Sequence, residues 1–544
     1  MYLAIIVLVF VAIVILNDQD NLDQTNFVFT REFRSSELLK NVSDSYHTSF
    51  PYKHCVLEGW ISDNILRNVR QEILENLVFS EKETDIYKVF QTGDLANISG
   101  LEKDERKRLF SLSLLKDALY SDEFRHFLSE VTGCGPLSGS VIDMSVNMYT
   151  QGCHLLAHDD VIGTRLVSFI LYLVDPDQPW LSLDGGALRL YPTLHPSFPD
   201  SQHEKAILPA WNQFCFFQVL PGFSFHDVEE VYSEKWRLSI SGWYHKPQPG
   251  EEGWQPSDGD FEDKAMSTLQ SLHSDSQEVD QPLIKPIICT FSFDKLTGKL
   301  SEDDFVYLKK WINPEYLEYS KMSQLKETFM EHSMVDLSNF LESDLADRVK
   351  QWIFNLENIG CPQILQDINP PWKMAKPIHK HRYLYIDCDA MTHETPFELL
   401  LHDLLIHPSF HRWLSIWTTL VPCSVFALGR RFRPGMDYTL ATSYISEQPM
   451  LNLTLSLTPL GYWGDGEKGG YEVYMEEDKD TDASVYRVSG DSILVSHLPT
   501  WNTLHIVLRD QGVLRFVKYI SKSACASRWD LIADIDLSNT SFSL

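Results

Sequence analysis

The stretch AHDDVIGTRLVSFILYLV, residues 157–174, places a polar His-Asp-Asp cluster directly before a long apolar run. This run is typical of a buried β-strand because it is rich in β-branched and aromatic residues. Further strand-like runs surround it, separated by clusters of Gly, Pro and Asp. These runs are SVNMY (145–149), ALRLY (187–191), FCFFQVL (214–220) and RLSISGWYH (237–245). Short strands at this spacing predict a β-sandwich or barrel.

Helical patterns precede these strands. Ser62-Asp63-Asn64 has the composition of a helix start, and apolar residues follow it at helical spacing. A second short helix is expected to begin near Ser121. We therefore predict a mainly β fold with flanking helices on one face, an α+β architecture.

The second half of the chain resembles the first. Lys468-Gly469-Gly470 before YEVYM echoes Asp184-Gly185-Gly186 before ALRLY, and LNLTLSL (451–457) echoes SFILYLV. Because these likenesses occur in the same order, we infer an internal duplication of one β-fold. The predicted domains are an apolar segment and polar lead-in over 1–50, a first β domain over 51–246, an acidic flexible linker over 247–284 and a second β domain over 285–544.

The composition limits the possible classes of function. At 544 residues the chain is too long for one ordinary hydrophobic core, and with 44% hydrophobic residues it is globular. Its formal net charge of −30 comes from 46 Lys and Arg against 76 Asp and Glu, so phosphate backbones repel it. We therefore expect no direct nucleic-acid binding and a basic polypeptide partner instead.

The cysteines and the N-terminus point to different compartments. The 9 cysteines form no CxxC pair, which disfavours a zinc module or disulfide scaffold and favours a reducing compartment. Residues 2–16, in contrast, form an apolar run. That run is shorter than the roughly 20 residues that span a bilayer, and it lacks the basic start and cleavage site of a signal peptide. Whether it is a signal, an anchor or a gene-model artefact stays open, and so does membrane association.

Three residues have the pattern of a metal centre. His158 and Asp160 stand two apart, so on a strand both point to the same side and can bind one ion. His226 follows another strand-like run and would reach the same ion from a neighbouring strand. Two imidazoles and one carboxylate on one face of an octahedral ion are the ligand set of non-haem Fe(II) oxygenases. The open positions would take a 2-oxo acid and then O2.

A basic residue follows at a suitable distance. Arg237 comes eleven residues after His226, at the head of a strand-like run. Its guanidinium fork matches the distal carboxylate of a 2-oxo acid and is always charged. Ser239 faces the same way two residues later and adds a hydroxyl donor.

Other residues compete for these roles. The pair His273 and Asp275 also fits the HxD pattern, but it lies in the acidic linker without a strand context. Asp159 and His154 lie close to the proposed ligands in the wrong parity or spacing. For these two residues we expect contacts with solvent or with the ligands rather than with the ion.

With these motifs, the chain resembles the 2-oxoglutarate- and Fe(II)-dependent oxygenases, and specifically the eukaryotic ribosomal prolyl 3-hydroxylase family, which includes the yeast termination and polyadenylation type. The resemblance runs from about His54 to Trp529. It is carried by AHDD, SFILYLV, RLSISGWYH, KKWINPEYL (309–317) and VLRFVKYI (513–520). It implies two tandem double-stranded β-helix domains of the jelly-roll or cupin type, the first one catalytic.

The resemblance also implies the cofactors and partners. Fe(II) would be bound by His158, Asp160 and His226, and 2-oxoglutarate by Arg237 with help from the two tyrosines Tyr149 and Tyr172. O2 would be the second co-substrate, and L-ascorbate would support the reaction. The substrate would be a proline in a basic decoding-centre protein of the small ribosomal subunit, with an effect on translation termination and fidelity. The family's location is the nucleus and cytoplasm.

The second half departs from the family's metal motif. The segment that resembles the HxD strand reads Tyr438 to Tyr444 without His or Asp, and Thr and Tyr are poor iron ligands. His505 and Arg515 could mimic the distal His and the Arg. Without the first ligand pair they would not hold iron. We therefore expect a degenerate, non-catalytic second domain that serves stability or substrate docking.

Two alternatives to this function stay open. The apolar N-terminus suggests a secretory-pathway prolyl 4-hydroxylase, although such enzymes typically use Lys where this chain has Arg237. The other alternative is a non-catalytic interaction protein that senses oxygen or 2-oxoglutarate and binds a regulatory partner. The position of the target proline, the ring carbon and the oligomeric state do not follow from the sequence.

Overall fold

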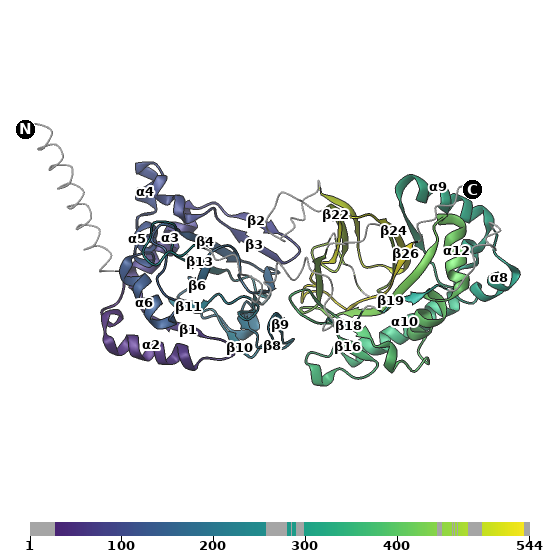
Figure 1. The fold of residues 1–544 in the computed structure, drawn as a ribbon, viewed down its shortest axis with the longest axis horizontal. Coiled ribbons are helices and arrows are strands. Elements are labelled where there is room, and N and C mark those ends of the chain that lie inside the picture. The colour runs from purple at the N-terminus through teal and green to yellow at the C-terminus, as the bar shows by residue number, and fades with distance from the viewer. Residues whose placement is uncertain are drawn as a thin grey trace, which may run out of the picture. The chain divides into compact units, whose positions relative to one another are not determined.

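The computed structural model describes residues 28–256, 280–283, 285–289, 299–442, 449–459, 461, 463–464, 466–476 and 492–537. The apolar run 2–16 and most of the predicted linker therefore lie outside the described residues. The chain divides into two compact units, which we describe separately (Figure 1). The first unit comprises residues 1–83 and 87–268, and the second comprises residues 84–86 and 269–544. In the described parts of both, no helix is long and apolar enough to cross a bilayer.

The first unit consists of an N-terminal group of helices and a strand-rich remainder. The helices are η1 (Arg31–Arg34), α2 (Ser36–Thr48), α3 (Asp63–Asn76), η2 (Leu95–Gly100), α4 (Lys103–Arg108), α5 (Phe110–Leu119), α6 (Asp122–Thr132) and η3 (Ser182–Asp184). The strands are β1 (His54–Glu58), β2 (Ser80–Glu83), β3 (Tyr87–Gln91), β4 (Asp143–Tyr149), β5 (His154–His158), β6 (Arg165–Tyr172), β7 (Leu188–Leu190), β8 (Thr193–His195), β9 (Phe198–Pro199), β10 (Lys205–Ile207), β11 (Gln213–Gln218), β12 (His226–Val228) and β13 (Arg237–His245).

Local sequence signals explain where the helices begin. The Ser121 hydroxyl accepts a hydrogen bond from the backbone N–H of Phe124 and so caps α6. Ser62 precedes α3 as predicted. Helix α2 lies ahead of the domain boundary expected at residue 51, yet its Val42 and Tyr46 are buried in the same core as the sheet. The compact first unit therefore extends further toward the N-terminus than the strand pattern indicates.

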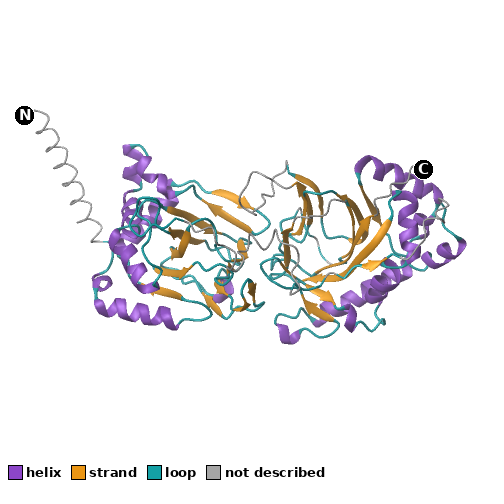
Figure 2. Ribbon diagram, in the orientation of Figure 1, coloured by secondary structure: helices purple, strands orange, loops and turns teal. Residues whose placement is uncertain are grey.

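The strands of the first unit curl into an antiparallel barrel. Their order is β1-β11-β6-β13-β4-β3-β5-β12-β7-β10, with β2 paired to β3. The helices lie on one side of these strands (Figure 2). This arrangement confirms the predicted fold class, mainly β with flanking helices and built on the double-stranded β-helix.

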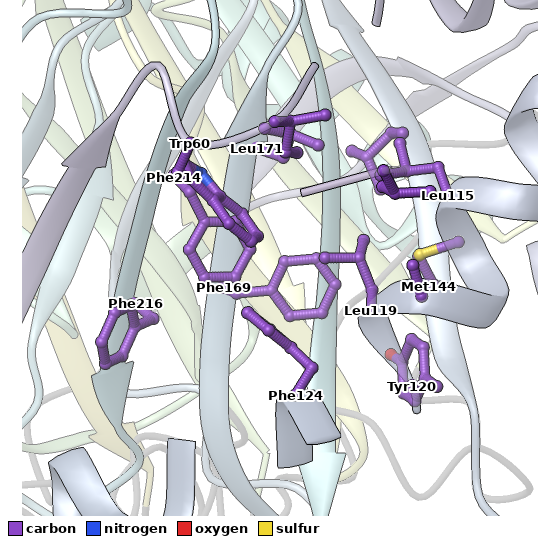
Figure 3. Packing of buried hydrophobic residues seen from close by; sticks show 14 of the residues in the cluster. Trp60, Leu115, Leu119, Tyr120, Phe124, Met144, Phe169, Leu171, Phe214 and Phe216 are labelled. Atoms are coloured by element: carbon purple, nitrogen blue, oxygen red, sulfur yellow. The ribbon is translucent and has the colours of Figure 1, made fainter. Parts of the chain in front are cut away.

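The main core lies between the helices and one face of the sheet. Phe214 and Phe216 of β11 point into it and meet Trp60, Phe124 and the helix residues around them (Figure 3). The Trp60 ring stacks on Phe124 with centroids 5.2 Å apart and meets Phe214 edge-on at 5.0 Å. Offset and edge-to-face contacts of this kind stabilise aromatic pairs beyond the area they bury.

A second, smaller apolar cluster lies on the other, inner face of the barrel. Because side chains alternate along a strand, Cys215 and Phe217 of β11 point away from the helices. They pack with Tyr52, which precedes β1, and with inner-face residues of other strands, namely Ile170, Tyr172, Leu188, Leu190 and Ile207, and Val56 packs against this set. We call this set the inner apolar cluster.

The second unit repeats this organisation with longer helices. Its helices are α8 (Glu302–Leu308), η5 (Pro314–Leu317), α9 (Tyr319–His332), α10 (Ser343–Ile359), η6 (Leu365–Asp367), η7 (Cys388–Ala390), α11 (Pro396–Leu399), η8 (Leu400–Leu405) and α12 (Pro408–Thr418). Its strands are β14 (Ile287–Ile288), β15 (Met334–Ser338), β16 (Trp372–Met374), β17 (His381–Arg382), β18 (Leu384–Ile386), β19 (Pro422–Phe432), β20 (Tyr438–Thr442), β21 (Met450–Leu457), β22 (Glu472–Glu476), β23 (Ile493–His497), β24 (Trp501–Arg509), β25 (Val513–Val517) and β26 (Arg528–Leu537).

The strand orders of the two units correspond. The first-unit path β1-β11-β6-β13-β4 recurs as β15-β24-β21-β26-β19, and β5-β12-β7-β10 recurs as β20-β25-β22-β23. β15 and β19 also belong to this strand-rich region, although they precede the run 451–457 that suggested the likeness. The matching orders agree with the internal duplication inferred from the sequence.

The paired glycines occupy equivalent turns in both units. Gly185 has φ +70° and Gly469 has φ +68°, a left-handed conformation that side chains rarely adopt. A Cβ at Gly185 would lie 2.1 Å from the carbonyl oxygen of Glu230, and one at Gly469 would lie 1.8 Å from that of Tyr519. The close backbone approach that opens β7 and β22 therefore requires glycine at both positions.

Candidate metal centre

The structure brings His158, Asp160 and His226 together at one end of β5 and β12. β5 ends at His158, and its partner across the strand pair is His226. Asp160 lies just beyond the strand with φ +61°, a left-handed conformation that Asp tolerates better than most residues. This backbone geometry, rather than a continued strand, turns the carboxylate toward the two imidazoles.

The three side chains are close enough to share one ion. His158 Nε2 lies 3.2 Å from Asp160 Oδ1, and His226 Nε2 lies 3.4 Å from Asp160 Oδ2. The two imidazole rings have centroids 4.3 Å apart. The ligand atoms all lie within 4.8 Å of one another, as a set that binds one ion requires.

Backbone carbonyls fix the orientation of both histidines. His158 Nδ1 lies 2.9 Å from the carbonyl oxygen of Leu156, and His226 Nδ1 lies 2.9 Å from that of Ser224. A carbonyl oxygen only accepts, so each Nδ1 donates to it and each Nε2 is the nitrogen turned toward Asp160. Both histidines are therefore held with Nε2 in position to bind a metal ion.

The carboxylate is held in its charged form. Burial alone would raise the pKa of Asp160, but the neighbouring His226 and His158 keep it well below its usual range. The hydroxyl of Ser168 also donates a hydrogen bond to Asp160 Oδ2 at 2.9 Å. An ionised, oriented carboxylate beside two imidazole nitrogens fits a divalent cation.

Arg237 lies inside the barrel without a carboxylate. Its side chain is 1% exposed, Nε donates to the carbonyl oxygen of Gly186 at 2.7 Å, and Nη2 donates to the Tyr172 hydroxyl at 3.3 Å. The rings of Tyr149 and Tyr172 each lie 5.0 Å from the guanidinium carbon. In the described residues no acidic side chain forms an ion pair with Arg237. Since an unpaired buried charge is costly, the site fits an anionic ligand such as the distal carboxylate of 2-oxoglutarate.

Further donors surround this guanidinium. The Ser239 hydroxyl is fully buried and has no hydrogen-bond partner in the described residues. The two tyrosines remain neutral phenols, since burial raises the pKa of Tyr149 to about 12 and raises that of Tyr172 as well, although Arg237 lowers both. Of the side chains named from the sequence, Arg237 pairs with Tyr149 across β13 and β4, and Ser239 pairs with Tyr172 across β13 and β6, so all four lie on adjoining strands.

Sequence reasoning missed two polar residues of this inner face. The hydroxyl of Tyr52 and the side-chain oxygen of Gln213 are buried without hydrogen bonds in the described part of the chain. Tyr52 lies close enough to Asp160 for that carboxylate to add to the effect of burial on its raised pKa. Neither residue belongs to a motif, and Tyr52 comes from the segment before β1, so no spacing rule could have indicated them.

An ion-pair network behind His226 was also missed. Arg189 binds Asp227 in a bidentate manner at 2.8 and 2.7 Å, and the Tyr191 hydroxyl donates to the same carboxylate at 2.7 Å. Asp227 follows His226 directly, so the network stiffens the backbone that carries the distal histidine.

The two residues that competed with the proposed ligands in the sequence have other contacts. Asp159 accepts a hydrogen bond from the backbone N–H of Gly222, and His154 Nδ1 contacts the carbonyl oxygen of Gly152.

The corresponding place in the second unit contains different residues. Strand pairing places Thr442 opposite Arg515 where the first unit has His158 opposite His226. Arg528 starts β26 as Arg237 starts β13, and it donates to the carbonyl oxygen of Gly470 as Arg237 does to that of Gly186. The counterpart of the distal histidine is therefore Arg515, and neither His505 nor Arg515 occupies the position expected from the sequence. The counterpart of Asp160 lies outside the described residues.

Buried ion pairs fill this part of the second unit. Arg515 lies 2.9 Å from Glu472 and 2.7 Å from Asp534, while Arg528 and Arg430 both bind Asp530, at 2.8 and 2.7 Å. Unlike Arg237, the guanidinium of Arg528 already has a carboxylate partner. Its site therefore has no unpaired charge to offer to 2-oxoglutarate.

Comparison with known proteins agrees with this geometry. A family model described as the 2OG-Fe(II) oxygenase superfamily matches residues 144–245, and one described as the oxoglutarate and iron-dependent oxygenase degradation C-terminal domain matches residues 303–541. The chain is 37% identical over 519 residues to prolyl 3,4-dihydroxylase OGFOD1 of Ostreococcus tauri, and this alignment covers 91% of this chain and 97% of the relative. It is 34% identical over 336 residues to prolyl 3-hydroxylase OGFOD1 of Mus musculus, which covers 61% of this chain and 50% of the relative.

The fold, the His-Asp-His group and the superfamily match define the first unit as a 2-oxoglutarate- and Fe(II)-dependent oxygenase. Enzymes of this class use Fe(II), 2-oxoglutarate and O2, so the cofactors expected from the sequence are confirmed at this level. Given its identity to the Ostreococcus protein over nearly the whole of both sequences, the chain belongs to the OGFOD1 family of prolyl hydroxylases.

Proposed function

We propose that the first unit hydroxylates a proline of a basic ribosomal protein, with Fe(II) bound by His158, Asp160 and His226 and 2-oxoglutarate anchored by Arg237. The observation that carries this proposal is the buried guanidinium of Arg237, which forms no ion pair with a carboxylate of the described residues and lies in the same barrel as the three candidate ligands. When bound, iron and 2-oxoglutarate supply the oxidation, in which O2 is consumed, 2-oxoglutarate becomes succinate and CO2, and one oxygen atom enters the substrate C–H bond.

The chain's own residues bind, orient and shield these reactants. Leu156 and Ser224 fix the two imidazoles through their carbonyl oxygens, and Ser168 orients the carboxylate of Asp160. The inner apolar cluster excludes water from the pocket, so charges within it interact strongly. Tyr172 and Ser239 supply hydroxyl donors beside Arg237, and Tyr149 places its ring against the guanidinium.

Two observations support a prolyl substrate in a basic protein. The curated relatives are named prolyl 3-hydroxylase or prolyl 3,4-dihydroxylase, and these names favour hydroxylation at carbon 3 of a prolyl ring. The net charge of −30 attracts a positively charged polypeptide such as a ribosomal protein. Action on the decoding-centre protein of the small subunit, with an effect on translation termination, would place the enzyme in the nucleus and cytoplasm. Ascorbate would keep its iron reduced.

The second unit is proposed to be non-catalytic. Arg515 stands at the position of His226, and the counterpart of Arg237 is neutralised by Asp530. A buried arginine does not bind a metal ion, because it stays protonated and has no lone pair to offer. The second unit would then serve stability or the docking of the substrate or a regulatory protein partner.

The test is mass spectrometry of a proline-bearing peptide from the decoding-centre ribosomal protein. The peptide is incubated with the full chain, Fe(II), ascorbate and 2-oxoglutarate, beside the His158→Ala variant and a peptide in which alanine replaces the proline. We expect the mass of one oxygen atom to be added to the proline peptide by the wild-type chain alone, with fragmentation and a hydroxyproline standard assigning the ring carbon.

Other outcomes would overturn defined parts of the proposal. Succinate formation without peptide oxidation would retain the oxygenase and reject the ribosomal substrate. Neither succinate nor oxidation, from a chain that binds Fe(II) and 2-oxoglutarate, would favour a sensing protein without turnover. Equal oxidation by the His158→Ala variant would reject the assigned metal centre.

A further inference from the structure

A second group of two histidines and one carboxylate lies in the second unit. It consists of Asp336 on β15, His497 on β23 and His505 on β24, and we call it the second-unit cluster. Asp336 Oδ1 lies 2.8 Å from His505 Nδ1 and 3.4 Å from His497 Nε2, and the two imidazole centroids are 4.1 Å apart. These separations are close to the 3.2, 3.4 and 4.3 Å of the first-unit centre.

Strand register shows that this cluster is not the degenerate copy of the first-unit centre. His505 pairs with Asp336 across β24 and β15, and His497 pairs with Glu472 across β23 and β22. The corresponding first-unit pairs are Cys215 with Val56 across β11 and β1, and Ile207 with Leu188 across β10 and β7. The cluster therefore stands where the first unit has part of its inner apolar cluster. The counterparts of Asp336, His497 and His505 are Val56, Ile207 and Cys215, which also pack together inside the first barrel. The fold itself therefore brings these three positions together.

His497 is the observation that calls for a ligand. Its side chain is 7% exposed, and neither ring nitrogen has a hydrogen-bond partner in the described residues. A buried polar group without a partner destabilises the fold, and a bound ion would remove that penalty. The Nε2 atom points toward the carboxylate of Asp336, which is 45% exposed and leaves a path for an ion from solvent.

The donor set and spacing select the kind of ion. In a tetrahedral site with bonds of about 2.0–2.1 Å, neighbouring ligand atoms lie about 3.3 Å apart, between the two measured separations of 2.8 and 3.4 Å. Two imidazoles and one carboxylate suit Zn²⁺, which binds such sites more tightly than Fe²⁺ does. A second oxygenase centre is disfavoured because the counterpart of Arg237, Arg528, is already paired with Asp530.

We propose that the second unit binds one divalent transition-metal ion, with Zn²⁺ the expected ion, between Asp336, His497 and His505. In the described residues, β15 begins one sheet of this barrel and β23 ends the other. The ion therefore links two strand edges that share no backbone hydrogen bonds with each other. Its role is to close the barrel, and it takes no part in hydroxylation.

The experiment uses the full chain with His158→Ala and His226→Ala, so that the first centre cannot hold the ion. Zn²⁺ is titrated in competition with a chromophoric chelator. We expect one Zn²⁺ per chain, at least a 100-fold weaker affinity after adding His497→Ala, and at least a tenfold weaker affinity after adding Asp336→Asn. The matched control is His332→Ala, on the exposed end of α9, which should leave the affinity unchanged.

Unchanged Zn²⁺ affinity in the His497→Ala chain, or no bound Zn²⁺ before that change, would overturn the proposal. Should the His497→Ala chain fail to fold, Co²⁺ added to the His158→Ala, His226→Ala chain gives an independent readout, since a tetrahedral Co²⁺ site absorbs visible light intensely. Absence of that absorption would also overturn the proposal. Excess Zn²⁺ should in addition raise the melting temperature of this chain, because a ligand that binds only the folded state stabilises it.

Discussion

At the scale of single residues, the difference between Arg237 and Arg528 separates the two units. Both arginines start equivalent strands and both donate to the carbonyl oxygen of a glycine. Arg528 has Asp530 as a partner, whereas Arg237 has two aromatic rings and a tyrosine hydroxyl. The same fold position therefore holds a structural ion pair in one unit, and in the other it holds a guanidinium that we propose binds an anion.

Arg237→Met should weaken 2-oxoglutarate binding specifically. Removing one partner of a buried charge pair costs about 2–5 kcal/mol, so the KM for 2-oxoglutarate should rise roughly 30-fold to several thousand-fold. Arg237→Lys should recover part of this loss, since it restores the charge without the fork. The control is Arg67→Met, which removes a solvent-exposed ion pair with Asp63. A KM unchanged by Arg237→Met would contradict the assignment of the carboxylate site.

The site residues that could be proposed from the sequence were those whose side-chain chemistry recurs at a defined spacing. His158 and Asp160 were found through their spacing, and Arg237 through its offset from His226. The sequence could not show that Asp160 adopts φ +61°, since only the fold imposes that turn. Nor could it show Tyr52, whose hydroxyl reaches the inner face from an irregular segment before β1.

At the scale of elements, local propensity decided which strands could be predicted. The strands β6, β11 and β13 were expected because they contain apolar runs rich in β-branched or aromatic residues. β5, which carries His158, was suggested only by the spacing of His158 and Asp160, because its sequence HLLAH contains no β-branched residue and no Phe, Tyr or Trp. Tertiary pairing with β12 and β3, rather than propensity, makes this segment a strand.

The correspondence between the halves shows the same limit. The Gly-Gly turns and the run 451–457 identified the duplication, but His505 and Arg515 were expected at the distal positions. His505 and Arg515 lie ten residues apart, close to the eleven that separate His226 and Arg237, so spacing alone is misleading. Only the pairing of β20 with β25 shows that Arg515 replaces His226.

The link between α8 and α12 should weaken at low pH. Asp304 of α8 is bound by Arg412 and Ser409 of α12. Burial alone would raise the pKa of Asp304, but hydrogen bonds from Arg412, Ser409 and Ser301 lower it to about 2. Because the folded pKa lies below the unfolded value of about 3.9, the stabilisation is complete above that value and is lost as the pH falls toward 2.

Urea unfolding of wild type and Asp304→Asn from pH 2 to pH 7 measures this link. The wild-type chain should be the more stable one at pH 7, and the difference in free energy of unfolding of the second unit should shrink steadily below pH 4. Asp347→Asn, on the exposed side of α10, is the control. A difference that stays constant down to pH 2 would show that the Asp304 carboxylate contributes nothing through its charge.

At the scale of the whole molecule, the balance of charge governs encounter with the substrate. With 46 basic and 76 acidic residues the chain carries a formal charge of −30, and this charge should speed the approach of a basic peptide. Salt screens such attraction, with a Debye length of about 10 Å at 0.1 M and about 3 Å at 1 M.

The KM of a basic proline peptide should therefore rise with ionic strength while kcat stays nearly constant. The comparison is a peptide of the same length in which glutamines replace the lysines and arginines distant from the proline. Its KM should depend little on salt. Equal salt dependence of the two peptides would show that long-range charge does not guide substrate binding.

We propose that each chain contains one oxygenase centre and that His158, Asp160 and His226 form it. The most direct measurement is an anaerobic titration of the full chain with Fe(II) and 2-oxoglutarate, followed by the charge-transfer absorption that a chelated 2-oxo acid gives on Fe(II). We expect one equivalent of the absorbing complex in the wild-type chain, none in His226→Ala, and an unchanged equivalent in His497→Ala. An absorbing complex that survives His226→Ala, or a second equivalent in the wild-type chain, would contradict it.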